Sequence, residues 1–321
     1  MSPAEPVEVG PPGTAPQTNY RKGLAYSIGA TLCIATMYPL GKYAMPGMGG
    51  APGWALVFAV AGSVFSVFML LVTGQIRHIL LRRDLWGSVL AIGLLNGVGA
   101  VGFWAGLERI DPTFASTLGR MLPVLCVLGG VVFYGERISR WELLPVGLII
   151  AGGVGAVAGR PSGEILGVGL TLGGCVMGAS QFILAKRIVH DIPVGALTAW
   201  RMIFAVPLVA TWAWSTGRLD YSAADPSHWS ATLGAAFLVS YLSRTLNFHA
   251  YRHWPIAYTS IVDFSQPVFV LPLALLLLGE MPNLQGILGG VVIIIGGVWL
   301  VLAHRQVHKD ATLQAEATEP Q

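Results

Sequence analysis

Long apolar runs separated by short polar connections dominate this sequence of 321 residues. A helix needs about 20 mainly apolar residues to cross the hydrocarbon core of a bilayer, and the chain holds ten runs of roughly that length. The runs lie at about 23–42, 54–73, 86–106, 113–133, 141–159, 165–185, 195–214, 229–250, 256–278 and 284–303. We therefore expect an all-α integral membrane protein with ten transmembrane helices. Because the connections are short, we expect function to lie within the helical bundle.

The composition supports a membrane protein and argues against a soluble domain, a nucleic-acid-binding protein and a disulfide-rich protein. Hydrophobic residues make up 54% of the chain and charged residues 11%, against about 25% charged in an ordinary soluble domain. A formal charge of +3, without a long basic block, gives no reason to expect a nucleic-acid partner. Cys33, Cys126 and Cys175 lie inside apolar runs without C-x-x-C spacing, so we expect neither a disulfide framework nor a metal. No cofactor motif with the right context is present either.

The chain repeats itself at an offset of 144 residues. Pro123 aligns with Pro267, Gly135-Glu136 with Gly279-Glu280, and Gly152 with Gly296. Such self-similarity marks a duplicated fold. We place the first five-helix repeat at residues 21–160 and the second at 161–304, with disordered tails at 1–20 and 305–321.

The distribution of basic residues predicts the orientation. Twelve of the 19 lysines and arginines fall on the side of the N-terminus, and only Lys42, Arg109, Arg160 and Arg218 fall on the other. The positive-inside rule therefore predicts that both termini are cytoplasmic. Each half holds five runs, an odd number, so the second half must enter the membrane from the opposite side. Inverted repeats of this kind are the construction of many secondary transporters, which expose a midplane site to each side in turn.

Four charged residues lie well inside the apolar runs: Arg120, Arg201, Arg244 and Asp263. A charge at this depth costs about 2.5–3.5 kcal/mol by insertion scales, so it faces the bundle interior and usually has a partner. Counting about 1.5 Å per residue places Arg201, Arg244 and Asp263 at one depth, about 10 Å from the inner face. Arg120 is expected at a different depth, about 10 Å below the outer face, without an evident partner. The excess of positive charge favours an anionic solute or the carboxylate of a zwitterion.

Polar residues at helical spacing extend this candidate site. The stripes comprise Ser116, Arg120 and Pro123 in the fourth run; Ser240, Arg244, Asn247 and Tyr251 in the eighth; and Ser260, Asp263, Gln266 and Pro267 in the ninth. Either proline frees a backbone carbonyl that could line a cavity. Weaker candidates for hydrogen bonding or stacking are Tyr38, Asn96, Trp104, Gln181 and Trp200.

The two five-run halves, the proline in the fourth and ninth runs, the Gly-Glu pair that closes each of them and the glycine-rich fifth and tenth runs resemble the EamA type of the drug/metabolite transporter superfamily. The resemblance covers about residues 21 to 303. It implies a central cavity lined by runs 1, 3, 4, 6, 8 and 9, with runs 5 and 10 supporting it from outside. It does not name the solute, because relatives carry amino acids, cationic drugs, nucleotide sugars, vitamins and phosphorylated metabolites. Arg120, Asp263 and Gln266 depart from the largely apolar residues expected before these prolines.

We therefore predict a secondary transporter, not an enzyme, that moves a small anionic or zwitterionic, amino-acid-like metabolite by alternating access. Export across the inner cell membrane is the expected direction. The expected partners are the solute and the lipid bilayer, and a homodimer remains open. Asp263 is the candidate for proton coupling, because it is the only acidic residue well inside a run and its pairing could change during transport.

Other interpretations of these residues remain. Asp263 and an arginine at its depth could form a structural pair, and the second arginine could extend to the inner surface. Gly97 to Gly102 spells G-x-G-x-x-G, but no strand precedes it. His249 and His253 share a helical face without the Glu of an H-E-x-x-H motif, so the expectation of no metal stands. An integral-membrane enzyme that acts on a lipid-linked substrate, or a channel, is the alternative function.

Overall fold

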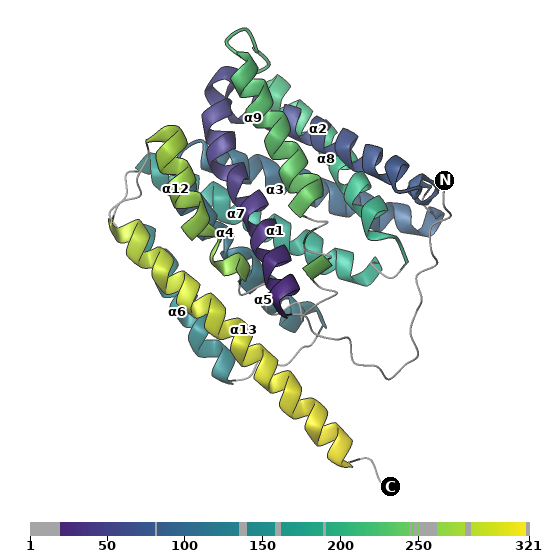
Figure 1. The fold of residues 1–321 in the computed structure, drawn as a ribbon, viewed down its shortest axis with the longest axis vertical. Coiled ribbons are helices and arrows are strands. Elements are labelled where there is room, and N and C mark those ends of the chain that lie inside the picture. The colour runs from purple at the N-terminus through teal and green to yellow at the C-terminus, as the bar shows by residue number, and fades with distance from the viewer. Residues whose placement is uncertain are drawn as a thin grey trace.

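The computed structural model describes residues 20–318 except 81, 135–139, 158–161, 189–190, 244–245, 247–248, 251–261 and 280–283. All regular elements within this part of the chain are helical (Figure 1). Five helices are long and apolar enough to cross a membrane: Arg21–Met48, Gly50–Val72, Arg83–Leu107, Gly163–Ala185 and Gly195–Ser215. Val262–Leu278 and Ile287–Leu300 are shorter apolar helices. The all-helical prediction is confirmed, and the count of ten spans stays a prediction.

The helices follow the predicted runs closely, with two interruptions. The main elements are α1 (Tyr20–Ala44), α2 (Gly50–Val72), α3 (Trp86–Leu107), α4 (Pro112–Gly119), α5 (Met121–Tyr134), α6 (Arg140–Val157), α7 (Ser162–Ile188), α8 (Val194–Ser215), α9 (Pro226–Phe237), α12 (Gln266–Leu278) and α13 (Leu284–Thr318). Short elements are η1 (Met45–Met48), η2 (Ile76–Ile79), η3 (Arg83–Leu85) and η4 (Leu238–Leu242), the last a single π-helical turn after α9. The fourth predicted run is broken at Arg120, and the ninth has a turn at Ser265.

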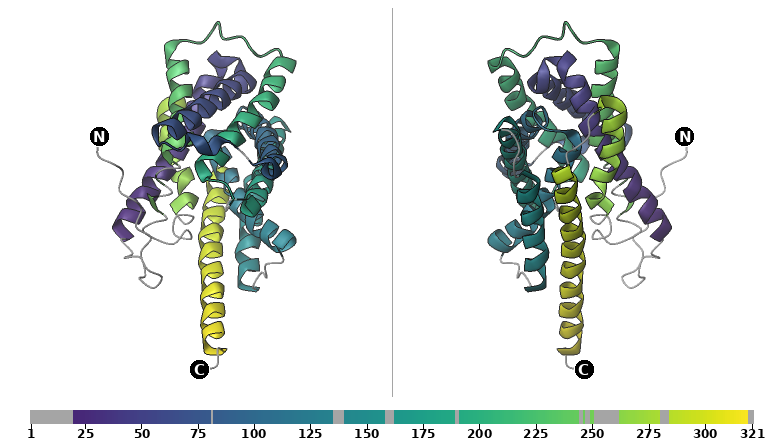
Figure 2. Two further views of the ribbon diagram at one scale, coloured as in Figure 1. Left: turned by 90° about the vertical axis from the view of Figure 1, so that its right-hand side faces the viewer. Right: turned by 90° about the vertical axis from the view of Figure 1, so that its left-hand side faces the viewer.

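The last helix, α13, extends beyond the tenth predicted run. The segment from residue 305 that we expected as a disordered tail is helical to Thr318, and it extends past the bundle, opposite the α8–α9 connection (Figure 2). Alanine, glutamine, lysine and glutamate are good helix formers, and they are frequent in this segment. An apolar helix already formed in the membrane therefore continues without a stop signal. The predicted N-terminal tail lies outside the described residues, apart from Tyr20.

Helix pairing has an internal regularity. α3 packs against α7 and α8, α5 against α7, and α2 against α8. At the offset of 144 residues, α3 corresponds to α9, α7 to α1, α8 to α2, and α5 to α12. The pairings equivalent to the first three are therefore α9 with α1, α9 with α2, and α12 with α1. All three are present. α6 and α13 pack against each other at one edge (Figure 1). The two halves of the chain thus use equivalent contacts.

Small residues allow α3 and α7 to approach closely. A β-carbon built on Gly174 would lie 2.8 Å from the Gly99 carbonyl oxygen, and one on Gly102 would lie 2.9 Å from the Leu170 carbonyl oxygen. Neither position has room for a larger residue. Gly169 and Gly173 on the same helix face open space. Glycines four residues apart, as in Gly102/Gly106 and Gly169/Gly173, therefore mark a packing surface in the first pair and open space in the second.

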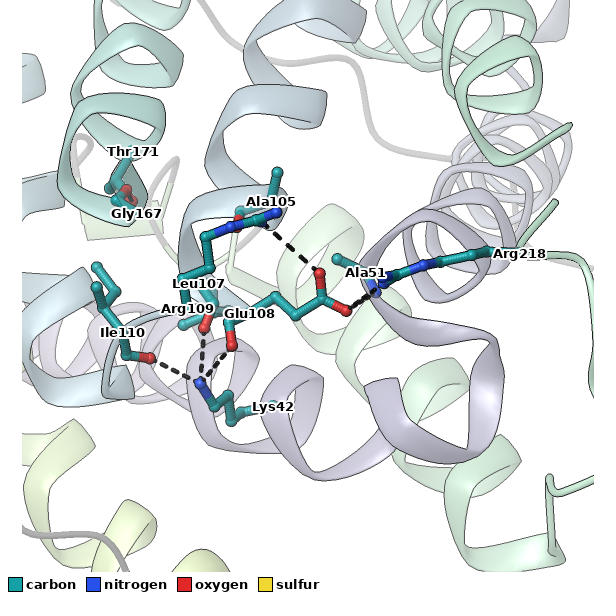
Figure 3. A network of polar contacts seen from close by, with 10 residues as sticks. All are labelled: Lys42, Ala51, Ala105, Leu107, Glu108, Arg109, Ile110, Gly167, Thr171 and Arg218. Atoms are coloured by element: carbon teal, nitrogen blue, oxygen red, sulfur yellow. Dashed lines mark hydrogen bonds and ion pairs between the residues drawn. The ribbon is translucent and has the colours of Figure 1, made fainter. Parts of the chain in front are cut away.

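One end of the bundle is held by cations bound to backbone groups (Figure 3). Lys42 Nζ donates hydrogen bonds to the carbonyl oxygens of Leu107, Glu108 and Ile110, at 3.0, 2.9 and 2.9 Å. These carbonyls stand at and just beyond the end of α3, where intrahelical partners run out and a positive charge is favoured. The lysine joins α1 to α3 and satisfies all three groups.

The Glu108 carboxylate extends this network to two further segments. It accepts a hydrogen bond from the Ala51 backbone N–H at 3.1 Å and forms an ion pair with Arg218 at 2.8 Å. Arg109 donates a hydrogen bond to the Ala105 carbonyl oxygen at 2.5 Å. We call Lys42, Glu108 and Arg218 the end network. Through it, α1, α2, α3 and the α8–α9 connection are bound together.

Gly174 and its neighbour Gly173 provide a matched test of the α3–α7 contact. Gly174→Ala should push α3 from α7, because overpacking costs about 1–3 kcal/mol, and lower Tm in detergent by about 2–4 °C or more. Gly173→Ala, in open space, should leave Tm unchanged or raise it, since alanine favours the helix by about 0.5–1 kcal/mol. Scanning fluorimetry of the two variants measures the difference. Equal Tm values would contradict the close contact.

Candidate functional site

A cavity of about 270 Å³ lies inside the bundle. Its described walls come from α1, α2, α3, the α4–α5 junction, α7, α8 and η4, and none of them belongs to α6 or α13. The lining side chains with polar or aromatic groups are Tyr38, Phe58, Asn96, Phe103, Trp104, Arg120, Gln181, Arg201 and Ser240. The remaining walls are aliphatic side chains, methionines, glycines and Cys175. Six of the eleven site residues expected from the sequence meet here.

Aromatic rings form one wall of the cavity. Trp104 lies 5.5 Å from Phe58 and 5.3 Å from Phe103 between ring centroids, and Tyr38 lies 5.8 Å from Phe103. Behind the wall, Trp54 is fully buried and packs against Trp104 at 4.5 Å. Because the rings brace one another through edge and tilted contacts, the wall offers firmly held aromatic surface to an apolar ligand.

The cavity has a second, polar zone, about two helical turns along α3 from the aromatic wall. It is formed by Asn96, Gln181 and Arg201. Asn96 Nδ2 donates to the Arg201 carbonyl oxygen at 3.5 Å and so joins α3 to α8. Gln181 enters from α7 and is 6% exposed. Asn96 and Trp104 are eight residues apart on α3, a separation of about 12 Å along the helix axis. The cavity therefore presents distinct aromatic and polar zones.

Arg120 lies at the interruption between α4 and α5 and binds a backbone carbonyl of another helix. Its Nη1 donates a hydrogen bond to the Asp263 carbonyl oxygen at 2.8 Å. In an α-helix that carbonyl would accept from residue 267, which is Pro267 and has no N–H. Arg120 therefore supplies the donor that the proline removes. The guanidinium also interacts electrostatically with the Tyr38 hydroxyl, and both side chains line the cavity.

The Asp263 carboxylate has a separate partner. Thr31 Oγ1 on α1 donates to Asp263 Oδ1 at 2.8 Å. The expectation that Arg120 has no evident partner is wrong, because its guanidinium reaches the Asp263 carbonyl oxygen. Counting residues along a straight helix gave the depth of each backbone, whereas a long guanidinium side chain reaches a neighbouring layer, and both helices are interrupted here.

The other predicted site residues divide into three groups. Ser116 is fully buried and returns its hydroxyl to the Thr113 carbonyl oxygen at 2.7 Å, so it does not face the cavity. Gln266 is 1% exposed and also lies outside the cavity lining. Arg244 and Asn247 lie outside the described residues. Trp200 donates to the Ile79 carbonyl oxygen at 2.8 Å and packs against Trp86 and Phe204, away from the cavity.

Sequence reasoning missed part of the lining. Phe58, Met202 and Met37 look like ordinary apolar span residues, so no local signal separated them from lipid-facing ones. The resemblance implied walls from runs 1, 3, 4, 6, 8 and 9, but α2 and α8, the second and seventh runs, contribute as well. For Gly119, beside Arg120, the sequence did hold a signal. Pro123 lacks the N–H that would donate to the Gly119 carbonyl oxygen, just as Pro267 lacks the N–H for Asp263.

The comparisons with known proteins agree on a family and a fold. The profile of the EamA-like transporter family matches residues 21–157 and again residues 165–303. A crystal structure of a protein superposes with a TM-score of 0.59 at 18% sequence identity, covering 89% of this chain and 99% of the other. That likeness shows the fold alone. No curated protein sequence matches the chain significantly.

The family matches cover both halves of the chain and coincide with the repeat found at 144 residues. Five helices are long and apolar enough to cross a bilayer. The chain is a multi-pass membrane protein and belongs to the EamA-like transporter family.

Proposed function

We propose that this protein is a secondary transporter for a small anionic or zwitterionic organic metabolite. The observation that carries the proposal is a metabolite-sized cavity with two arginines, Arg120 and Arg201, in its lining and no acidic side chain among its described lining residues. A buried guanidinium binds a carboxylate through charge-assisted, often bidentate, hydrogen bonds. Membership of a transporter family indicates that the bound solute is carried across the membrane.

Alternating access is the proposed mechanism. The equivalent helix pairings of the two halves support a pseudo-twofold arrangement, and the five spans expected in each half would make the repeats inverted. In such an arrangement the two halves can exchange conformations. The exchange closes the cavity on one side of the membrane and opens it on the other. Orientation with both termini in the cytoplasm, residence in the inner cell membrane, and export remain predictions from the sequence.

The end network has a defined role in this cycle. With cytoplasmic termini, Lys42, Glu108 and Arg218 lie at the external end of the bundle. The network joins α1, α2 and α3 to the α8–α9 connection there. A state open to the outside must separate some of these elements, so breaking the ion pair between Glu108 and Arg218 is part of the proposed opening.

Two competing functions make different demands on the site. An enzyme for lipid-linked substrates needs a nucleophile with a base, or a metal cluster, and the described lining residues include no histidine or carboxylate. A channel needs a continuous aqueous path, whereas the aromatic wall and the aliphatic lining surround a confined polar zone. Saturable counterflow in proteoliposomes distinguishes a carrier from both.

Arg120 should dominate anion binding. A screen of purified protein against metabolites by thermal shift should find ligands that carry a carboxylate. Arg120→Gln should weaken their binding about tenfold or more, because a hydrogen bond to a charged group contributes about 1.5–3 kcal/mol. The control is Arg109→Gln, which changes an exposed arginine outside this cavity. A cationic ligand whose affinity is unchanged by Arg120→Gln would contradict the anion preference.

Asp263 is proposed to couple transport to protons. Asp263→Asn should keep solute binding, since an amide oxygen can still accept from Thr31 and the backbone carbonyl still accepts from Arg120. It should abolish the stimulation of transport by a pH gradient, which proteoliposome uptake measures. Thr31→Val is the control, because it removes the hydrogen bond and leaves the titratable group. Undiminished stimulation in Asp263→Asn would remove the coupling role.

The inverted arrangement can be tested with two exposed loop residues at nearly equivalent places, Thr73 after α2 and Ser222 after α8. In a background without the native cysteines, an impermeant maleimide added to intact cells should label Ser222→Cys and spare Thr73→Cys. Permeabilised cells should show both labelled, which controls for reactivity. Labelling of both from outside would place equivalent loops on one side and contradict inversion.

A further inference from the structure

We propose that the transported solute is a carboxylic acid with a ring-bearing apolar body and without an ammonium group. This inference rests on the proposed function and chooses between the anionic and zwitterionic solutes left open there. It follows from three features of the cavity: where the cation stands relative to the aromatic wall, which charges are missing, and how much space is available.

The cation and the aromatic wall are adjacent. Arg120 and Tyr38 both line the cavity and interact electrostatically, and the Tyr38 ring lies 5.8 Å from Phe103, which in turn contacts Trp104 at 5.3 Å. A carboxylate bound to Arg120 therefore has a wall of rings within a few ångströms. A ring joined to that carboxylate through a short chain can pack against this wall, where aromatic pairs add to the stabilisation that burial provides.

Arg120 keeps N–H donors available for such a ligand. Its Nη1 donates to the Asp263 carbonyl oxygen, a neutral group. The Asp263 carboxylate accepts from Thr31 and also attracts the Arg120 guanidinium through space. A guanidinium has five N–H donors in a planar fork, so one backbone partner leaves donors for a carboxylate. The guanidinium is thus held at the cavity by a hydrogen bond that does not neutralise it.

Among the described lining residues, the carboxylates that an ammonium requires are missing, because none of them is Asp or Glu. The undescribed residues between 244 and 261 add none, because the sequence has no acidic residue between Asp225 and Asp263. Asp263 itself lies outside the lining, where its carboxylate accepts from Thr31 and attracts Arg120. Taking an ammonium out of water without a paired charge is costly. Aromatic faces do attract cations, but Arg120 and Arg201 line the same cavity and oppose another positive charge.

Neutral polar groups can be accommodated in the second zone. Asn96 and Gln181 place amide groups on α3 and α7, beside the cavity. Amides bind hydroxyl and keto oxygens without a change of charge. The volume of about 270 Å³ lies at the lower end of sites for drug-sized ligands, which span roughly 300–1,000 Å³. A hydroxy or keto acid with a single ring therefore suits the cavity better than a nucleotide sugar.

A matched set of probes tests this assignment. 3-Phenyllactate and phenylalanine differ only in a hydroxyl against an ammonium, 3-phenylpropionate has neither, phenethylamine lacks the carboxylate, and lactate lacks the ring. We expect 3-phenyllactate and 3-phenylpropionate to bind the purified full-length protein, measured by isothermal titration calorimetry and thermal shift. Phenylalanine and lactate should bind at least about tenfold more weakly, and phenethylamine should not bind.

Two variants locate the binding. Arg120→Gln should weaken the binding of 3-phenylpropionate about tenfold. Phe103→Leu should also weaken the binding of 3-phenylpropionate but leave the binding of lactate unchanged. Arg109→Gln is the matched control and should change neither. The Tm of each variant without ligand reports whether the fold is kept, and the comparison among probes on the unaltered protein needs no variant.

The outcomes separate this inference from the proposed function. If phenylalanine binds as tightly as 3-phenyllactate, the inference is overturned, while saturable counterflow of phenylalanine would still support a carrier of zwitterions. Tight binding of phenethylamine would overturn both the inference and the anion preference. If bound acids show no counterflow in proteoliposomes, the transport proposal fails even though the site binds as described.

Discussion

The hydrogen bond from Arg120 to the Asp263 carbonyl is the interaction on which the site depends. Inside a bilayer, backbone polar groups must find partners within the protein, because no water is available. Pro267 removes the N–H that would serve this carbonyl, and an arginine from the other half of the chain replaces it. The bond therefore joins the α4–α5 interruption to the start of α12, and it fixes the cation at the edge of the cavity.

A cation also binds backbone carbonyl groups at the end of the bundle. Lys42 serves three carbonyl oxygens around the end of α3, as Arg120 serves one before α12. In both places a cation satisfies backbone dipoles rather than a carboxylate. The consequences differ with position, because the end network also includes the Glu108 carboxylate, whereas the described cavity lining has no acidic group. The described lining of the cavity is consequently cationic, while the Asp263 carboxylate stands outside it and attracts Arg120 through space.

Helices that form the cavity are separated from helices that support it. α6 and α13 pack against each other, with Ile149 and Ile293 fully buried between them, and contribute none of the described cavity lining. Close approach of α3 and α7 through glycines, by contrast, determines how much space remains beside Gly99 and Gly174, which line the cavity. In the proposed function, solute selection is therefore concentrated in α1, α3, α7 and the α4–α5 junction, which supply the amides, Arg120 and most of the aromatic wall.

The sequence by itself determined the helical class, the approximate helix bounds, the duplication and several lining residues, including Arg120, Arg201 and Asn96. These follow from local quantities: the length of an apolar run and the cost of a charge inside it. It did not determine that Arg120 reaches Asp263, that Ser116 turns back to its own helix, or that Phe58 and Phe103 form a wall with Trp104. Only the tertiary structure decided those points, because they depend on side-chain reach, on helix interruptions and on which face of an apolar helix meets its neighbours.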